Sequence, residues 1–189
     1  MKSLSKPELD ALLAVSGEHR LMFLVTFNHG LRVSETLSLT RDNLSSMLLT
    51  VQRLKGSKRT IQPLLPQEQA ELLALAASTT GYLFLPEYDN RESARRIFNK
   101  LMRKYGKLAG IPEHKCHAHA IKHSTGRLAY EGGMGIPELQ KYLGHVNGKN
   151  TMVYLEASEE QASAAFAAAV GGTDARSCRI ASQHDTIDC

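Results

Sequence analysis

Helix start and stop signals recur along most of the chain, and they limit it to a fold built mainly of short helices. Ser5-Lys6-Pro7-Glu8 has the pattern of a capping box and predicts the start of a helix. A second helix is expected from about residue 18 to 29, because Gly30 provides a good left-handed cap. Further helices are predicted after Ser34 and over residues 67–77, 91–108, 118–131, 137–143 and 152–170.

One stretch departs from this helical pattern. Residues 47–51 and 60–64 have the composition of short strands, and a basic turn with Gly56 at its centre joins them. The two segments predict an antiparallel hairpin. The fold class expected is therefore mostly α (α+β): a helical bundle with a small antiparallel β-element.

The length and composition are those of one globular domain. The chain has 189 residues, of which 42% are hydrophobic and 22% charged, and this excludes a wholly disordered or fibrous protein. We expect one domain over residues 1–170 and a disordered tail over 171–189, which is rich in Gly, Ser, Thr and Asp. No apolar run approaches the roughly 20 residues that span a bilayer, so we expect a cytoplasmic protein with no membrane partner.

The net charge of +4 is small, but the cations are concentrated in two places. Residues 53–59 hold four cations and no acid, and residues 91–107 hold seven cations against Glu92 alone. Such clusters favour an anionic partner. For the turn with Lys55, contact with a phosphate is one interpretation. The other is a charged edge that discourages sheet pairing.

Two further motifs carry charged groups at suggestive spacings. In Gly30–Glu35, the Glu35 carboxylate could hold the Arg32 guanidinium in one orientation, although a surface cap with an incidental salt bridge is the alternative. On a helix, His119 and Lys122 would share a face and could approach one anion. A zinc site among residues 114–119 is the less favoured interpretation, because no second ligand pair lies elsewhere in the sequence. We therefore expect no metal.

A last motif lies near the carboxyl end of the predicted domain. Leu143-Gly144-His145 is followed nine residues later by Tyr154, which has polar neighbours. A lone tyrosine usually packs at an amphipathic surface, and that alternative stays open for Tyr154. In this order, however, the motifs resemble the catalytic domain of the tyrosine recombinase (phage integrase) family, over about residues 3–166. The segments 27–32 and 53–65 look most like the short recombinases that switch fimbrial promoters.

This resemblance implies a site-specific recombinase or integrase that breaks and rejoins DNA. Tyr154 would attack a phosphodiester and form a 3′-phosphotyrosyl bond. Arg32, held by Glu35, would bind the non-bridging oxygens, and Lys55 would protonate the leaving 5′-oxygen. His119 and His145 would donate hydrogen bonds to the phosphate or manage the tyrosine proton. The resemblance implies no cofactor, and it suggests DNA contacts from the two basic clusters: Arg53, Lys58, Arg59, Arg95, Arg96, Lys100 and Arg103.

The sequence departs from the family pattern at one position, because Lys122 stands where the family has arginine. Lysine keeps the charge but cannot form the planar fork of two bonds to a phosphate. The alternative hypothesis is therefore a non-catalytic DNA-binding regulator that retains the fold. A type IB topoisomerase shares the chemistry, but the chain looks too short and too close to the integrase motifs for that class.

The resemblance also implies partners and an assembly. We expect double-stranded DNA with a specific recombination site, a protein that is monomeric in solution and a homotetramer on paired sites that exchanges its carboxyl-terminal segments. The expected localisation is the bacterial cytoplasm. Because the first capping box lies at Ser5, we expect no amino-terminal core-binding domain. Either a naturally short protein or a shortened chain would account for that.

Overall fold

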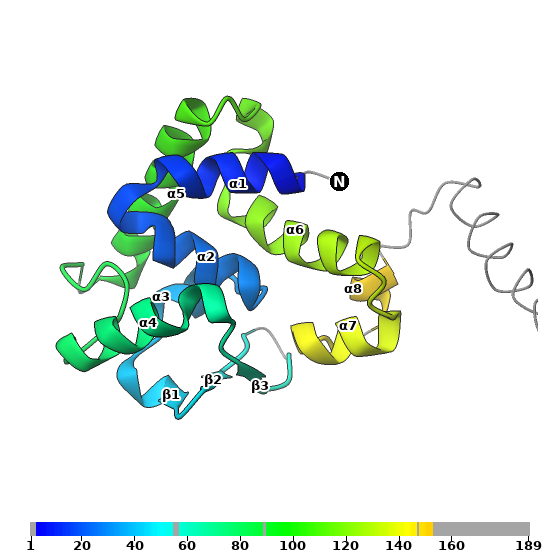
Figure 1. The fold of residues 1–189 in the computed structure, drawn as a ribbon, viewed down its shortest axis with the longest axis horizontal. Coiled ribbons are helices and arrows are strands. Elements are labelled where there is room, and N and C mark those ends of the chain that lie inside the picture. Colours follow the sequence, from blue (N-terminus) through cyan, green and yellow to red (C-terminus); the bar gives the residue numbers. More distant parts are fainter. Residues whose placement is uncertain (1–2, 55–56, 89, 147, 153–189) are drawn as a thin grey trace, which may run out of the picture. The chain divides into compact units, whose positions relative to one another are not determined.

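The computed structural model describes residues 3–54, 57–88, 90–146 and 148–152, all of which belong to one compact unit (Figure 1). Four of the sequence predictions fall on residues outside these ranges: Lys55, Tyr154, most of the helix expected over 152–170 and the tail expected over 171–189. The described helices longer than one turn are α1 (Lys6–Val15), α2 (Arg20–Asn28), α3 (Val33–Leu37), α4 (Pro66–Ser78), α5 (Arg91–Leu108), α6 (Ala118–Glu131) and α7 (Ile136–Leu143).

Helix α2 lies at the centre of the bundle and contacts α1, α3, α4 and α6 (Figure 1). Its sequence is apolar around most of its circumference, as expected of a helix with neighbours on several sides. Phe23 is fully buried and meets Phe98 of α5 edge to face, with ring centroids 5.3 Å apart. The mostly helical fold class is confirmed.

The β-element has three strands rather than the two expected. Strands β1 (Leu44–Ser45), β2 (Leu48–Val51) and β3 (Thr60–Pro63) pair antiparallel in that order. Val51 pairs with Thr60 at the end of the hairpin, which places the basic turn beyond that pair. The strand β1 is too short to show a period of two in the sequence, and it exists only because it pairs with Leu48 and Leu49.

Several helix boundaries agree with the sequence analysis, whereas three local details differ. The expected helix over 18–29 begins as a 3-10 turn, η1 (Gly17–His19), before α2. Helix α3 begins at Val33, so Arg32 and not Ser34 occupies the N-cap position. Helix α5 has the expected bounds, but its buried stripe runs through Ala94, Phe98 and Met102. The spacing of the apolar residues predicts a face through Ile97, Leu101, Tyr105 and Leu108. Of these, Tyr105 is buried and Ile97 and Leu101 pack partly buried against the core, whereas Leu108 is 63% exposed.

The remaining short elements connect the larger ones. They are the 3-10 helices η2 (Arg41–Asn43) and η3 (Glu113–Lys115) and the helix α8 (Lys149–Met152). None of the described helices has both the length and the apolar composition that crossing a membrane requires.

Candidate nucleic-acid cleavage site

Four of the residues selected from the sequence meet in one region between the hairpin, α6 and α7. Arg32 lies in the turn before α3, Glu35 lies in α3, and Lys122 lies in the second turn of α6. His145 follows α7 directly. Their charges are close enough to shift one another's pKa, as the pKa values of Glu35, Lys122 and His145 show.

The Arg32–Glu35 pair is built as expected from the sequence. Arg32 Nη1 donates to Glu35 Oε1 at 2.7 Å, and the Arg32 backbone N–H donates to Oε2 at 2.8 Å. Because Gly30 adopts a φ of +56°, the chain can turn sharply between α2 and this pair. A Cβ at Gly30 would collide with the Leu143 side chain of α7, so the turn packs against α7 without space for another residue type.

The Glu35 carboxylate is fully buried and accepts four hydrogen bonds. Besides the two from Arg32, it accepts one from the Leu54 backbone N–H at 3.0 Å and one from Arg53 Nη1 at 3.3 Å. Burial alone would raise its pKa, but the backbone hydrogen bonds of Arg32 and Leu54, together with the nearby positive charge of Lys122, lower it. Glu35 therefore carries a negative charge that is fixed in place.

Arg53 differs from the expectation that it contacts DNA. Its side chain is fully buried, and all of its donors face acceptors inside the protein. The Arg53 guanidinium is therefore not accessible to a DNA duplex at the protein surface. The burial of Arg53 could not be recognised from the sequence, because a buried arginine and a surface arginine look alike within a basic run.

The turn that contains Lys55 is held against the site by its described neighbours. Leu54 O accepts a hydrogen bond from Arg32 Nη1 at 3.2 Å, and Ser57 Oγ accepts one from Arg32 Nη2 at 3.4 Å. The Lys58 N–H donates to Gly144 O at 3.0 Å. Lys55 itself lies outside the described residues, but both of its described neighbours in sequence, Leu54 and Ser57, contact Arg32.

Lys122 is buried beside these groups with only 6% of its surface exposed, and its Nζ has no hydrogen-bond partner within the described part of the chain. Burial lowers the pKa of Lys122 to about 8, against the opposing effect of Glu35, and the charges of Arg32 and Arg53 lower it further. An ammonium in such a place is costly unless an anion joins it. Lys122 is the strongest structural sign of an anion site.

His145 is positioned by the glycine that precedes it. Gly144 adopts a φ of +69° at the end of α7, and a Cβ there would approach Lys58 O to 2.6 Å. The His145 Nδ1 lies 3.0 Å from Thr151 Oγ1. Burial, followed by the charges of Lys122, Arg32 and Arg53, lowers the pKa of His145 to about 4, so the ring is neutral at pH 7. Thr151 precedes Tyr154 by three residues, and Tyr154 lies outside the described residues.

His119 is exposed at the start of α6, and its ring lies 5.9 Å from the ring of His123. His123 was not selected from the sequence, although it follows His119 by four residues and so shares its face. Burial, aided by the charges of His119 and Lys122, lowers the pKa of His123. His123 therefore joins the candidate site.

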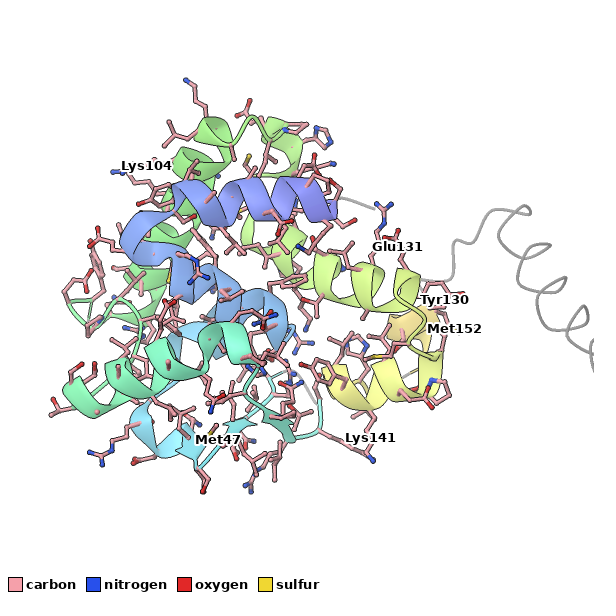
Figure 2. All side chains as sticks on the ribbon, viewed as in Figure 1. Met47, Lys104, Tyr130, Glu131, Lys141 and Met152 are labelled. Carbon is pink, nitrogen blue, oxygen red and sulfur yellow. The ribbon has the colours of Figure 1, made fainter. Side chains whose placement is uncertain are left out.

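The expected DNA-contacting cations other than Arg53 are all exposed: Lys58, Arg59, Arg95, Arg96, Lys100 and Arg103. Four of them lie on α5, where neighbouring Lys104 also projects from the helix (Figure 2). Arg95 forms an exposed ion pair with Glu92 at 3.0 Å, which is too weak a contact to hold it away from a phosphate.

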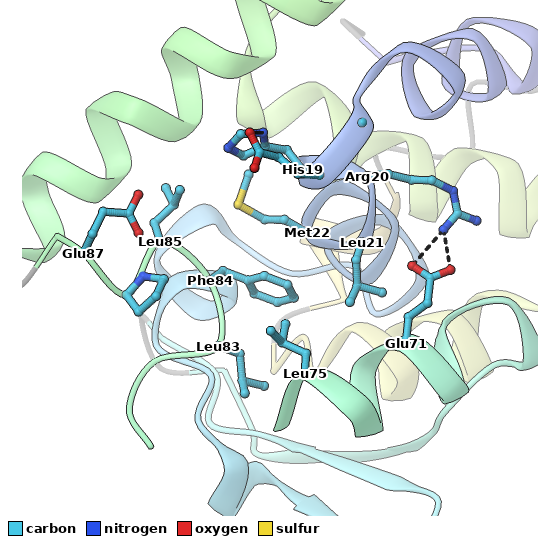
Figure 3. Close-up of a pocket in the computed structure, with 13 residues that line it drawn as sticks. His19, Arg20, Leu21, Met22, Glu71, Leu75, Leu83, Phe84, Leu85 and Glu87 are labelled. Atoms are coloured by element: carbon cyan, nitrogen blue, oxygen red, sulfur yellow. Dashed lines mark hydrogen bonds and ion pairs between the residues drawn. The ribbon is translucent and has the colours of Figure 1, made fainter. Parts of the chain in front are cut away.

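A surface pocket of about 730 Å³ shares no lining residue with this cluster. Its walls come from the start of α2, from α4 and from residues 83–87, and they include none of the selected site residues (Figure 3). Its charged residues are Glu18, Glu71, Glu87 and Arg20, and Arg20 is paired with Glu71 at 2.9 Å. An acidic rim over an apolar floor does not suit a nucleic acid.

Three cations, Arg32, Arg53 and Lys122, surround one carboxylate at the candidate site, which leaves an excess of positive charge. This arrangement can bind a phosphodiester and stabilise the charge that develops when it is attacked. Among the described residues, no group of three or more histidine, cysteine or acidic side chains is placed to hold a metal ion.

The chain is similar in sequence to known proteins. The chain is 30% identical over 171 residues to the tyrosine recombinase XerA of Thermococcus kodakarensis, covering 84% of this chain and 59% of the relative. It is 25% identical to XerD of Vibrio cholerae, covering 85% and 58%. The chain thus spans less than two thirds of the length of these relatives.

Solved structures show the same fold at lower sequence identity. The crystal structure of XerA recombinase matches with a TM-score of 0.69 at 23% identity, covering 89% of this chain and 65% of that one. The catalytic domain of bacteriophage HP1 integrase matches with a TM-score of 0.64 at 21% identity, covering 87% and 92%. The model of the phage integrase family matches residues 2–161, and the chain therefore belongs to that family.

Proposed function

We propose that this chain is the catalytic domain of a site-specific DNA recombinase that cleaves and rejoins DNA through a 3′-phosphotyrosyl intermediate. The observation that carries the proposal is the cluster of Arg32, Lys122 and the neutral His145 around Glu35, assembled from three separate motifs. Within the part of the chain that the structure describes, the Lys122 ammonium has no hydrogen-bond partner, as expected of a site that receives a phosphate.

The described residues supply the binding half of the reaction. The Arg32 side chain is 19% exposed, and among the described residues its Nη2 contacts only Ser57 Oγ, at 3.4 Å. Nη2 can therefore turn one face to a non-bridging oxygen while Nη1 stays on Glu35. The Lys122 ammonium provides the second positive charge, and a neutral His145 can donate one hydrogen bond through its ring.

The covalent half rests on the two residues outside the described part. The Tyr154 oxygen would attack phosphorus, and the bond from phosphorus to the 5′-oxygen would break. Lys55 would give its proton to that oxygen, which leaves as a 5′-hydroxyl. The 3′-phosphate would stay on the tyrosine, so a second 5′-hydroxyl can reverse the step without nucleotide hydrolysis. His119 and His123 would complete the polar wall beside Lys122.

The proposed substrate is double-stranded DNA with a specific site, contacted by the exposed cations of the hairpin turn and α5. One structural relative was solved with such DNA, the XerH recombinase bound to its difH substrate, with a TM-score of 0.71 at 18% identity. We further propose a tetramer on paired sites. The finer likeness to fimbrial-switch recombinases also stays a proposal, since the relatives described above are Xer recombinases.

A covalent trapping experiment tests the proposal. The duplex that the protein binds most tightly, selected from DNA flanking its gene, is nicked beside the expected cleavage point so that a cut end diffuses away. Wild-type protein is expected to give a protein–DNA adduct, and Tyr154→Phe none. Tyr130→Phe, a change at a half-buried tyrosine of α6, serves as the matched control and retains the adduct. An adduct from Tyr154→Phe, or none from wild type, refutes the proposed mechanism.

The second candidate is a DNA-binding regulator that keeps the fold without the chemistry. The observation in its favour is that Lys122 cannot form the two-bond fork of an arginine. Lys122→Arg separates the two candidates. An adduct that forms only in Lys122→Arg identifies a chain that has lost its activity, whereas an adduct in both proteins shows that the lysine is sufficient.

A further inference from the structure

We propose that Arg53 is a positioning residue of the site rather than a DNA contact. In this role it holds the Glu35 carboxylate and the base of the turn with Lys55 in register with Arg32 and with the Gly144–His145 turn. The proposal rests on the proposed function, because that function is what makes Arg32, Glu35 and His145 a catalytic site. The hydrogen bonds of Arg53 are observed whether or not that function is correct.

The five N–H groups of the Arg53 guanidinium face five acceptors from separate parts of the chain. Nε donates to Thr60 Oγ1 at 3.1 Å, across the mouth of the hairpin. The other acceptors are Gly30 O at 3.0 Å, His29 O at 2.9 Å, Tyr142 O at 3.3 Å and Glu35 Oε2 at 3.3 Å. A lysine has three donors and no planar fork, so it cannot join the ends of α2 and α7 to the hairpin in this way.

The acceptors of Arg53 are themselves held in place by a second buried network. The His29 ring lies between Gln62 Oε1 at 2.8 Å and Glu68 Oε1 at 2.7 Å. Gln62 Nε2 donates to the same Tyr142 carbonyl that Arg53 uses, at 2.8 Å, and this fixes the orientation of its amide. Both nitrogens of His29 therefore lie within hydrogen-bond distance of side-chain oxygens, which fixes the ring between β3 and α4.

The link to the reaction runs through Glu35. Arg32 Nη1 and the Leu54 N–H use one carboxylate oxygen, and Arg53 uses the other together with the Arg32 N–H. Arg53 thus holds Glu35 from the inside and leaves the outer face of Arg32 open. Without Arg53, Glu35 can rotate, and the Leu54 end of the Lys55 turn loses its anchor.

Arg91 offers a matched control. Its guanidinium also donates to backbone carbonyls, those of Leu37, Phe84, Leu85 and Tyr88, and it lies 4.0 Å from the ring centre of Tyr82. None of these partners belongs to the site. Arg53→Lys and Arg91→Lys therefore remove similar structural arginines, and only the first disturbs Glu35.

Amide hydrogen exchange of the full chain tests the proposal without any DNA. In Arg53→Lys, exchange at Arg32 and Leu54, both of which donate to Glu35, is expected to rise about tenfold more than at Leu9 in α1. In Arg91→Lys, the exchange rates of these two amides are expected to rise no more than that of the Leu9 amide. Should Arg53→Lys not fold, Thr60→Val removes one acceptor and gives a smaller rise at the same amides. An equal rise at all amides, or none, overturns the proposal.

A second measurement uses the adduct assay. At saturating DNA, Arg53→Lys is expected to slow adduct formation about tenfold while its affinity for DNA stays within about twofold, because Arg53 touches no phosphate. Arg91→Lys changes neither quantity. Weaker DNA binding with an unchanged rate at saturation would make Arg53 a DNA contact and overturn the proposal. If wild type forms no adduct, the proposed function fails, and hydrogen exchange still decides the role of Arg53.

Discussion

The two sides of the candidate site are built in opposite ways. On the hairpin side, Glu35 and Arg53 are saturated with hydrogen bonds inside the protein. On the side of α6 and α7, the Lys122 ammonium is buried with no hydrogen-bond partner in the described chain, and His145 is kept neutral. The hairpin side is therefore satisfied within the protein, whereas the other side keeps a buried cation, for which we propose an anionic ligand.

The largest expected effect is loss of the scaffold carboxylate. Glu35→Ala leaves two guanidinium groups and the Leu54 N–H without their acceptor in a buried place. We expect a loss of about 3–5 kcal/mol in the free energy of unfolding, the usual result of removing one partner from a buried ion pair. Urea unfolding measures it. A loss below about 1 kcal/mol would show that the hairpin side is no scaffold.

On the side of α6 and α7, a substitution is expected to raise the free energy of unfolding rather than lower it. Lys122→Met keeps the length of the side chain and removes a buried ammonium that has no hydrogen-bond partner among the described residues. We expect a gain of about 1–3 kcal/mol in the free energy of unfolding at pH 7, together with loss of the DNA adduct. Greater stability with lower activity is the mark of a site that awaits a ligand. If Lys122→Met destabilises the protein, the ammonium has a partner and the contrast between the two sides fails.

The pH dependence of stability sharpens this point. Because folding lowers the pKa of Lys122 to about 8 from 10.5, the destabilising effect of its charge is fully present below pH 8. As pH rises from about 8 to 10.5, the unfolded chain holds the proton that the folded chain has released, so stability is regained. The stability difference between Lys122→Met and wild type is therefore expected to shrink over this range, as denaturation midpoints at pH 7, 9 and 10 would show. A constant difference contradicts a lowered pKa.

The smallest effect is expected at His145 and is spectroscopic. Folding lowers its pKa to about 4, so its ring signals should stay constant between pH 5 and 7, where an ordinary histidine titrates. As pH falls from about 6.5 to about 4, the unfolded chain binds a proton that the folded chain resists, so stability falls over that window. Nuclear magnetic resonance of the ring carbons follows this, with a short histidine-containing peptide as the reference. Titration of His145 near pH 6.5 would show that the cations do not surround it.

Much of this site could be predicted from the sequence because its residues lie in short motifs with local causes. Gly30 before Arg32 and Gly144 before His145 mark positive φ values, and the spacing of Arg32 and Glu35 follows from one turn of helix. The burial of Arg53 could not be predicted, because its five acceptors come together only in the tertiary fold. The buried face of α5 was predicted only in part: Leu108 is exposed, and Phe98 is buried by its contact with Phe23, which helix period alone does not reveal.

We propose that Lys122 binds a DNA phosphodiester, which Tyr154 attacks. Mass spectrometry of the protein–DNA adduct, digested with a protease and a nuclease, tests it most directly. The account predicts one modified peptide, with a nucleotide joined through its 3′-phosphate to Tyr154. A phosphate carried by another residue, or joined through the 5′ end of the strand, would contradict it.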